Sequence, residues 1–386
     1  MRMVNEMTDD ISGGGVVRVS RLKKYFPIKA GVFQRTAGYV KAVDDVSFTI
    51  KRGTTMGLVG ESGCGKSTIG RTVLRLTEKT SGEVLIDGTD IFSLKKEPLR
   101  RMRPKIQIIF QDPFSSLSPR LPVGEIIGEA VREHKIVPPE EFDGYITKIM
   151  TDCGLMEYHK DRYPHEFSGG QRQRICIARA LALNPEFIIC DEPVSALDVS
   201  IQAQIINLLM KLQAEYGLTY LFISHDLSVV RHISNTVGVM YLGGMVESAP
   251  TDMLFDNPLH PYTKALFSAI PVLDPDARAA RIILEGSIPS PANPPKGCKF
   301  HTRCKECMTV CRHVAPPVKE YEPGHEVACH LYDTPEESAE LNGKAEEIIL
   351  ENERQAELRA REAAEQSFFK RRLSRLKRLF IKKPNE

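Results

Sequence analysis

The chain has 386 residues, of which 42% are hydrophobic and 26% charged, so it can bury sizeable cores and is not a disordered chain. Its 52 basic and 50 acidic side chains nearly balance, which argues against the broad positive field of a protein that binds nucleic acid. The sequence lacks an apolar run of the ~20 residues that span a bilayer, and its first fifteen residues lack the apolar stretch of a signal peptide. We therefore expect a cytoplasmic protein of two or three domains.

Apolar runs and helical repeats alternate along the first two thirds of the chain. Strands are predicted for residues 16–22, 42–50, 54–59, 81–87, 106–110, 187–190 and 218–224, with an irregular surface loop at 27–39. Helices are predicted for residues 66–76, most of 112–184 and 201–216. The runs at 187–190 and 218–224 are continuously apolar, as in parallel strands buried on both faces. This alternation favours an α/β fold around a parallel sheet.

The composition changes after about residue 260. A Pro-rich segment, 287–295, leads into five cysteines between Cys298 and Cys329, and the charged segment 334–364 suits an exposed helix. We therefore expect a flexible tail at 1–15, an α/β domain at 16–260 with a helical subdomain at 112–185, a cysteine-rich domain at 261–333 and a charged helical tail at 334–386.

A glycine-rich segment follows the predicted strand at 54–59 and opens a helix. It reads Gly60, Glu61, Ser62, Gly63, Cys64, Gly65, Lys66, Ser67 and Thr68, which matches the phosphate-loop pattern G-x-x-x-x-G-K-[ST] in its proper context. Glycines let backbone N–H groups converge on phosphate oxygens, and the helix start adds positive potential. Lys66 would supply charge to the β- and γ-phosphates, and the Ser67 hydroxyl would ligate Mg²⁺. The segment predicts a nucleoside triphosphate site.

Two later strands end in polar residues that suit phosphate chemistry. Asp191 and Glu192 follow the run 187–190. Asp191 would hold Mg²⁺, directly or through water, and Glu192 would polarise the attacking water. His225 follows the run 218–224; alone it would be read as a structural histidine, but its place among these strand ends favours a hydrogen bond to the γ-phosphate and the water.

A second glycine segment precedes a predicted helix. It consists of Ser168, Gly169, Gly170 and Gln171, in which the first and last residues have the spacing of a capping box. A plain helix start explains it locally. Its glycine pair also leaves N–H groups accessible to an anion. Because the segment is far in sequence from the phosphate loop, it could serve a second nucleotide across a subunit interface.

These motifs, together with Gln111 and the segment 195–198, resemble the ATP-binding subunit of an ABC transporter over about residues 16–261. The runs 111–120 and 257–262 and the C-terminal cysteines are similar to those of bacterial oligopeptide/dipeptide importers, closest to the F-type of the paired D- and F-type subunits. The resemblance implies a P-loop NTPase with a RecA-like core sheet, an antiparallel β subdomain, a helical subdomain and a small cysteine-rich C-terminal domain. Phe167 stands where the family usually has Leu.

The resemblance also implies a mechanism and partners. Each ATP would lie between one subunit's phosphate loop and the 168–171 segment of the other in a heterodimer with a D-type ATPase subunit, and Asp198 would bridge the two sites. Gln111 would link Mg²⁺ and the γ-phosphate to two transmembrane permease subunits that dock near residues 112–120. Phe26, with Tyr25 as second choice, would stack on adenine. Closure would drive import at the cytoplasmic face of the cell membrane, with an extracytoplasmic substrate-binding protein as an indirect partner.

The C-terminal cysteines have the spacing Cys298-x5-Cys304-x6-Cys311-x17-Cys329, with Cys307 inserted. In a reducing compartment such crowding favours a metal site. Spacing alone favours neither Zn²⁺ nor an iron–sulfur cluster, and residues 304, 307 and 311 form an alternative trio. The importer family carries a [4Fe–4S] cluster at positions matching Cys298, Cys304, Cys311 and Cys329, so the resemblance implies that cluster, with Zn²⁺ as the alternative and a structural or redox-sensing role.

The chain ends in a basic stretch, 368–383, in which Phe369, Leu373, Leu376 and Phe380 share one helical face. This tail could touch anionic membrane or form a solvated helix. The expected function is ATP hydrolysis that energises a peptide importer. The alternatives are a nickel or other small-solute importer, because parts outside this chain choose the cargo, a non-transport ABC ATPase that acts on DNA or ribosomes, and a redox regulator.

Overall fold

The computed structural model describes residues 15–31, 34–270 and 282–380, so the expected N-terminal tail falls almost wholly outside the described residues. The chain forms two units. The first holds the described residues up to Pro294 with Arg303–Lys305 and Val318–Ala328, and the second holds Pro295–Thr302, Glu306–Pro317 and the described residues from Cys329 onward. Within the described ranges, no helix is both long and apolar enough to cross a membrane.

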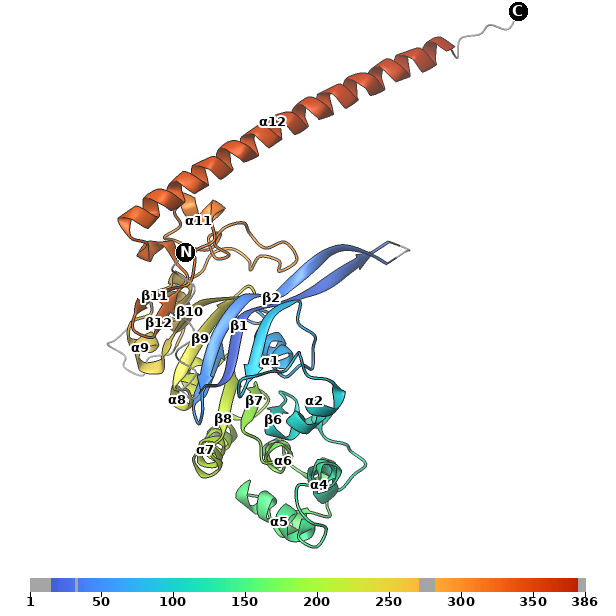
Figure 1. The fold of residues 1–386 in the computed structure, drawn as a ribbon, viewed down its shortest axis with the longest axis vertical. Coiled ribbons are helices and arrows are strands. Elements are labelled where there is room, and N and C mark those ends of the chain that lie inside the picture. Colours follow the sequence, from blue (N-terminus) through green and yellow to red (C-terminus); the bar gives the residue numbers. More distant parts are fainter. Residues whose placement is uncertain (1–14, 32–33, 271–281, 381–386) are drawn as a thin grey trace, which may run out of the picture. The chain divides into compact units, whose positions relative to one another are not determined.

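An antiparallel sheet of four strands lies in the first unit, in the order β2-β1-β4-β5. The strands are β1 (Gly15–Ala30), β2 (Arg35–Lys51), β4 (Ser81–Ile86) and β5 (Thr89–Asp90). The surface loop predicted at 27–39 is wrong, because Pro27 pairs with Tyr39 and Ile28 with Gly38 in the outer part of a long β1–β2 hairpin (Figure 1). Ile28 and Tyr39 are both exposed, so the pattern of alternating burial that marks a strand in sequence is missing there.

The second sheet has eight strands in the order β11-β12-β10-β9-β3-β8-β7-β6. They are β3 (Thr55–Val59), β6 (Ile106–Ile109), β7 (Phe187–Asp191), β8 (Thr219–Ile223), β9 (Thr236–Tyr241), β10 (Gly244–Pro250), β11 (Lys319–Glu322) and β12 (His325–Val327). Strands β9, β3, β8, β7 and β6 run parallel, which confirms the expected α/β core, and the remaining pairs are antiparallel. Every residue of β3, β7 and β8 is buried, as their continuous apolar runs predicted.

Most of the helices lie between these strands in the chain, and α12 follows the last strand (Figure 1). They are α1 (Lys66–Val73), α2 (Lys96–Met102), α3 (Pro113–Ser116), α4 (Val123–His134), α5 (Phe142–Asp152), α6 (Gly169–Leu181), α7 (Val199–Tyr216), α8 (Leu227–Ile233), α9 (Thr251–Asp256), α10 (Pro261–Phe267), α11 (Thr309–His313) and α12 (Pro335–Phe380). Short 3₁₀ turns are η1 (Arg103–Lys105), η2 (Glu157–His159), η3 (Pro164–Glu166) and η4 (His330–Tyr332). Helix α12 includes residues 368–380 of the basic tail, but the side chains of its predicted apolar stripe lie outside the described residues.

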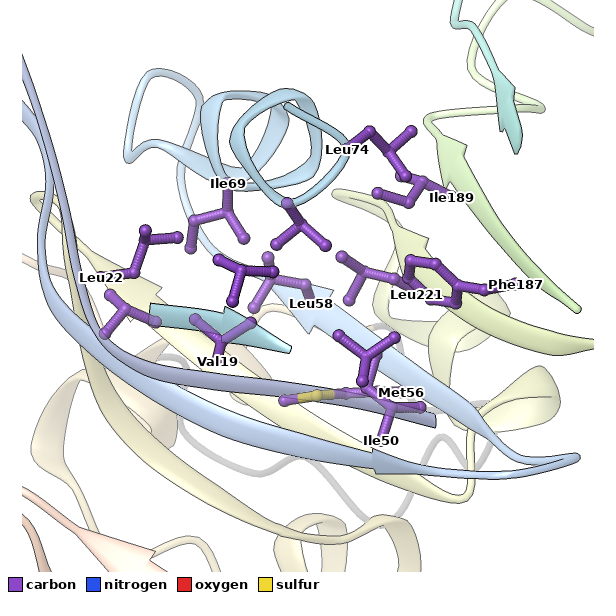
Figure 2. Close-up of a cluster of buried hydrophobic side chains, with 14 of the residues drawn as sticks. Val19, Leu22, Ile50, Met56, Leu58, Ile69, Leu74, Phe187, Ile189 and Leu221 are labelled. Carbon is purple, nitrogen blue, oxygen red and sulfur yellow. The ribbon is translucent and has the colours of Figure 1, made fainter. Parts of the chain in front are cut away.

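The main core joins the two sheets to α1 (Figure 2). Val19, Leu22 and Ile50 come from the antiparallel sheet, and Leu58 comes from β3. Ile69 comes from α1, and each of these five side chains is at most 2% exposed. Full burial of such a side chain is worth about 1.5–3 kcal/mol, so this packing fixes the strand and the helix between which residues 60–65 run.

The second unit has a smaller apolar cluster. Val310 and Cys311 of α11 pack with Ala345 of α12, and Cys298 and Cys307 lie against them. The Cys298 N–H donates to the Cys311 carbonyl oxygen at 2.8 Å. In this arrangement Cys311 serves as a buried apolar side chain.

Candidate active site

The predicted phosphate loop connects the end of β3 to the start of α1. Gly60 and Gly65 have φ angles of 147° and 109°. A Cβ on Gly60 would lie 2.2 Å from the Met240 carbonyl oxygen, and one on Gly65 would lie 2.1 Å from the Ala42 carbonyl oxygen. The loop is therefore packed against the backbone on either side, and only glycine fits at these two positions.

Lys66 turns back onto the loop that precedes it. Its ammonium donates to the carbonyl oxygens of Gly60 at 2.7 Å and Glu61 at 3.1 Å, and the residue is only 5% exposed. The positive charge is thus fixed at the loop and does not extend into solvent. Cys64 is buried beside it, and that burial raises the pKa of its thiol, so the side chain is a neutral packing group.

Ser67 and Asp191 bring two oxygen ligands together. The Ser67 hydroxyl donates to Asp191 Oδ1 at 2.7 Å, which joins the first turn of α1 to the end of β7. Asp191 is 3% exposed, and its burial raises the pKa of the carboxyl. A hydroxyl and a carboxylate fit Mg²⁺, which usually takes one or two protein oxygens and completes its shell with phosphate and water.

Three neighbouring strands, β6, β7 and β8, deliver Gln111, Glu192 and His225 to one place. Gln111 Nε2 donates to Glu192 Oε2 at 2.8 Å, and His225 Nδ1 lies 3.3 Å from the same oxygen. Glu192 has a left-handed φ of 49°, which is held because its N–H donates to the Ile223 carbonyl oxygen at 3.0 Å. Such a conformation in a residue other than glycine is costly and recurs at active sites. The carboxylate adjacent to Asp191 is therefore oriented by two further side chains.

The chain matches two families of known proteins. Residues 43–195 match the family described as ABC transporter, and residues 246–311 match the oligopeptide/dipeptide transporter C-terminal region. The oligopeptide transport ATP-binding protein AppF of Bacillus subtilis is 57% identical over 320 residues, which cover 82% of this chain and 97% of that protein. The chain belongs to the ATP-binding proteins of the ABC transporter family.

Two further comparisons support the assignment. The probable peptide ABC transporter ATP-binding protein y4tS of Sinorhizobium fredii is 52% identical over 316 residues, which cover 82% of this chain and 90% of that protein. A dimeric, post-hydrolysis structure of the ATP-binding cassette MJ0796 with ADP and Pi has a TM-score of 0.54 and 30% identity, and covers 61% of this chain and 98% of that one. The ABC ATPase fold expected from the sequence is confirmed.

In this ABC cassette the segment 168–171 begins α6. The Ser168 N–H donates to Gln171 Oε1 at 3.1 Å and the Gln171 N–H to Ser168 Oγ at 3.4 Å, so the capping box is confirmed. A Cβ on Gly170 would lie 2.5 Å from Ile201 Cγ2, in the first turn of α7 after Asp198. The segment predicted to meet a partner's nucleotide and the segment predicted to bridge the two sites are therefore packed together within one chain.

The two candidates for adenine stacking have different surroundings on β1. The Tyr25 hydroxyl donates to Asp44, which ties that side chain down. Phe26 is 40% exposed, with the Lys24 ammonium 4.6 Å from its ring centroid. Phe26 is thus partly exposed with a cation beside its ring, and adenine stacking on it stays a prediction.

Tyr262 and Arg303, which the sequence did not mark as site residues, also contact the phosphate loop. The Glu61 N–H donates to the Tyr262 hydroxyl at 2.9 Å, and Arg303 Nη1 donates to Glu61 Oε2 at 2.8 Å. The run 257–262 was recognised only as a family feature. Nothing in the sequence pairs the tyrosine of this run with residue 61.

The cysteines predicted to bind a metal are not assembled as a metal site. Within the ranges that the structure describes, no group of three or more His, Cys, Asp or Glu side chains is arranged to hold a metal ion. As arranged, these residues do not fit a [4Fe–4S] cluster or Zn²⁺, and the ligand set remains a prediction from the sequence.

Proposed function

We propose that this ABC ATPase binds and hydrolyses MgATP and that the cycle drives import of oligopeptides or dipeptides. The observation that carries the proposal is the Glu192 carboxylate, held by Gln111 and His225 directly after the Asp191–Ser67 pair. The relatives named for oligopeptide and peptide transport support a peptide cargo over nickel or another small solute.

Each part of the site has a distinct task in hydrolysis. Lys66 and the backbone N–H groups of the loop would bind the phosphates, and Ser67 and Asp191 would hold Mg²⁺, which would supply positive charge to the β- and γ-phosphates. Glu192 accepts a proton from the attacking water, while Gln111 and His225 orient its carboxylate. ATP would close a sandwich of two cassettes, and hydrolysis with release would reopen it, to the extent that ATP favours the closed state.

Replacement of Glu192 by Gln tests this assignment. With the partner and membrane subunits present, Glu192→Gln should retain ATP binding and lose about 100-fold or more of the ATPase rate, because the general base is removed and the side-chain shape is kept. Glu215→Gln, on the surface of α7, is the matched control and should leave the rate unchanged. Turnover near the wild-type rate in Glu192→Gln would show that another group activates the water.

The proposed assembly contains this chain, a D-type ATPase subunit and two permease subunits at the cytoplasmic face of the membrane, with an extracytoplasmic binding protein as an indirect partner. Phe114 supports permease docking near residues 112–120, because its ring is 65% exposed and the Arg172 guanidinium lies 3.8 Å from the ring centroid. The dimeric cassette among the solved structures supports the nucleotide sandwich. Purification of the tagged chain from membranes should recover these subunits; recovery of the chain alone would count against the assembly.

We also propose, from the family resemblance alone, that Cys298, Cys304, Cys311 and Cys329 hold a [4Fe–4S] cluster. Anaerobically purified protein should contain iron and acid-labile sulfide and absorb broadly in the visible range. Cys329→Ser should lose both, and Cys307→Ser should retain them. Zinc without iron would favour the alternative metal, and the absence of both metals would reject the site.

A further inference from the structure

We propose that Tyr262 and Arg303 are positioning residues that set the affinity of the phosphate loop for ATP by holding Glu61. The proposal rests on the proposed role of residues 60–67 as the ATP site. All three residues lie in the first unit, although they are far apart in the sequence.

Glu61 is held at both its main chain and its side chain. Its N–H donates to the Tyr262 hydroxyl at 2.9 Å, and its carboxylate accepts from Arg303 at 2.8 Å. The Arg303 side chain is 8% exposed and that of Glu61 is 25% exposed. A charge-assisted hydrogen bond that is partly removed from water is stronger and less screened than a surface ion pair. The two contacts together leave Glu61 little freedom.

Tyr262 is itself part of a rigid, buried turn. It is fully buried, and its N–H donates to His260 Nδ1 at 3.0 Å at the start of α10. The buried Glu247 carboxylate accepts the N–H groups of Leu259 at 2.7 Å and His260 at 3.0 Å. His325 Nε2 of β12 lies 2.8 Å from the same carboxylate. The hydroxyl that meets the phosphate loop is therefore placed by residues of β10 and β12 and of the turn that begins α10.

The contact reaches the phosphate-binding lysine through one residue, Glu61. The Lys66 ammonium donates to the Glu61 carbonyl oxygen at 3.1 Å, while the Glu61 N–H is bound by Tyr262. A shift of Glu61 would therefore move a carbonyl oxygen that holds the ammonium. Small displacements of a positioned group have large effects on binding and rate, which is why a residue that never touches ATP can alter its affinity.

The test is a titration of the purified full-length chain with a fluorescent ATP analogue and Mg²⁺. Arg303→Ala and Tyr262→Phe should each raise Kd about 10-fold, the size expected when one hydrogen bond that positions a binding loop is lost. Arg303→Lys should recover part of the affinity. Arg312→Ala, which removes an exposed arginine from α11, is the control and should match the wild type. Circular dichroism checks that each variant is folded.

A double substitution separates positioning from a general structural role. If Arg303 acts through Glu61, Arg303→Ala should cause no further loss of affinity in a Glu61→Ala background. An equal loss in both backgrounds, or a wild-type Kd in Arg303→Ala and Tyr262→Phe, would overturn the inference. Should Arg303→Ala fail to fold, Tyr262→Phe, which removes a single oxygen atom, decides the question. A wild-type chain that binds no ATP would instead reject the proposed function.

Discussion

The backbone conformation of Glu192 and the order of the neighbouring strands determine which groups its carboxylate contacts. Its position after a buried strand was readable from the sequence, as were those of Asp191, His225 and the glycines of the phosphate loop. Its left-handed φ of 49° was not, because no local pattern requires it. The convergence of Gln111 and His225 on one carboxylate oxygen also depends on β6, β7 and β8 being adjacent in the sheet.

Phe26 is the residue that we expect to stack on adenine. Phe26→Ala should weaken ATP binding by about 1–3 kcal/mol, the usual worth of a base stacked on an aromatic ring, without a comparable loss of stability. The reason is that its ring is 40% exposed and contributes little to the core. Isothermal titration calorimetry with MgATP measures the change. Tyr39→Ala, which removes a ring that is 51% exposed on β2, is the control, and an equal effect of both variants would contradict stacking on Phe26.

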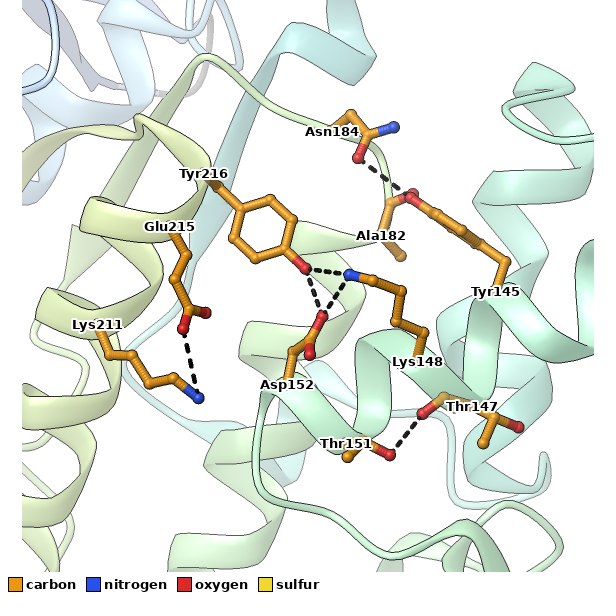
Figure 3. Close-up of polar contacts among 10 residues, drawn as sticks. All are labelled: Tyr145, Thr147, Lys148, Thr151, Asp152, Ala182, Asn184, Lys211, Glu215 and Tyr216. Carbon is orange, nitrogen blue, oxygen red and sulfur yellow. Dashed lines mark hydrogen bonds and ion pairs between the residues drawn. The ribbon is translucent and has the colours of Figure 1, made fainter.

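The helices that follow β6 are tied to the parallel core by a small polar network (Figure 3). Lys148 of α5 donates to Asp152 Oδ2 at 2.7 Å and to the Tyr216 hydroxyl, at the end of α7, at 2.8 Å. That hydroxyl in turn donates to Asp152. Burial alone would raise the pKa of the Asp152 carboxyl, but the hydrogen bonds from Lys148 and Tyr216 lower it overall. The network therefore favours ionised Asp152 and joins α5 to α7.

Replacement of Tyr216 measures how much the hydrogen bonds between α5 and α7 contribute to stability. Tyr216→Phe should lower the free energy of unfolding by about 1 kcal/mol, because it removes hydrogen bonds and keeps the ring. Since the folded-state pKa of Asp152 is depressed, the contribution should be present above its unfolded-state pKa, about 3.9, and be lost as pH falls through the folded-state value. Urea unfolding at neutral and acidic pH measures both. Arg21→Ala, whose guanidinium is 3.7 Å from Asp45 on the surface, should change little; a similar loss there would refute the assignment.

The outer β1–β2 hairpin and the Arg303–Glu61 pair could not be predicted from the sequence, for physical reasons. The outer β1–β2 hairpin pairs through its main chain while both faces stay exposed, so residues 27–39 show no strand periodicity. Arg303 and Glu61 are 242 positions apart, and charged residues are too common for such a pair to be chosen from one sequence. The cysteine spacing suggested a ligand set, which stays a prediction because spacing alone does not determine which thiols converge on one ion.

Binding of MgATP at one site should raise the free energy of unfolding of the whole chain. MgATP at 100 times its Kd should stabilise the native chain by about 2.7 kcal/mol, provided that the unfolded chain does not bind it. Lys66→Ala should abolish most of that gain, since the ammonium that is fixed at the loop is removed. Thermal unfolding with and without MgATP measures it, with Lys211→Ala as a surface control that should keep the wild-type response. A persistent gain in Lys66→Ala would place the binding site elsewhere.

The central position of β3 has a consequence for synthesis on the ribosome. Met56 pairs with Leu221 on one side and with Thr236 on the other, so the strand that leads into the phosphate loop is made early and its neighbours are made late. An emerging chain therefore carries an apolar strand without its sheet partners until most of the cassette has been translated, and in that interval it is open to wrong pairing and aggregation. We expect the yield of folded protein to fall when translation is slow before residue 220 or when chaperones that cover nascent strands are scarce. The loss should be larger than for a protein whose strands pair with their neighbours in sequence.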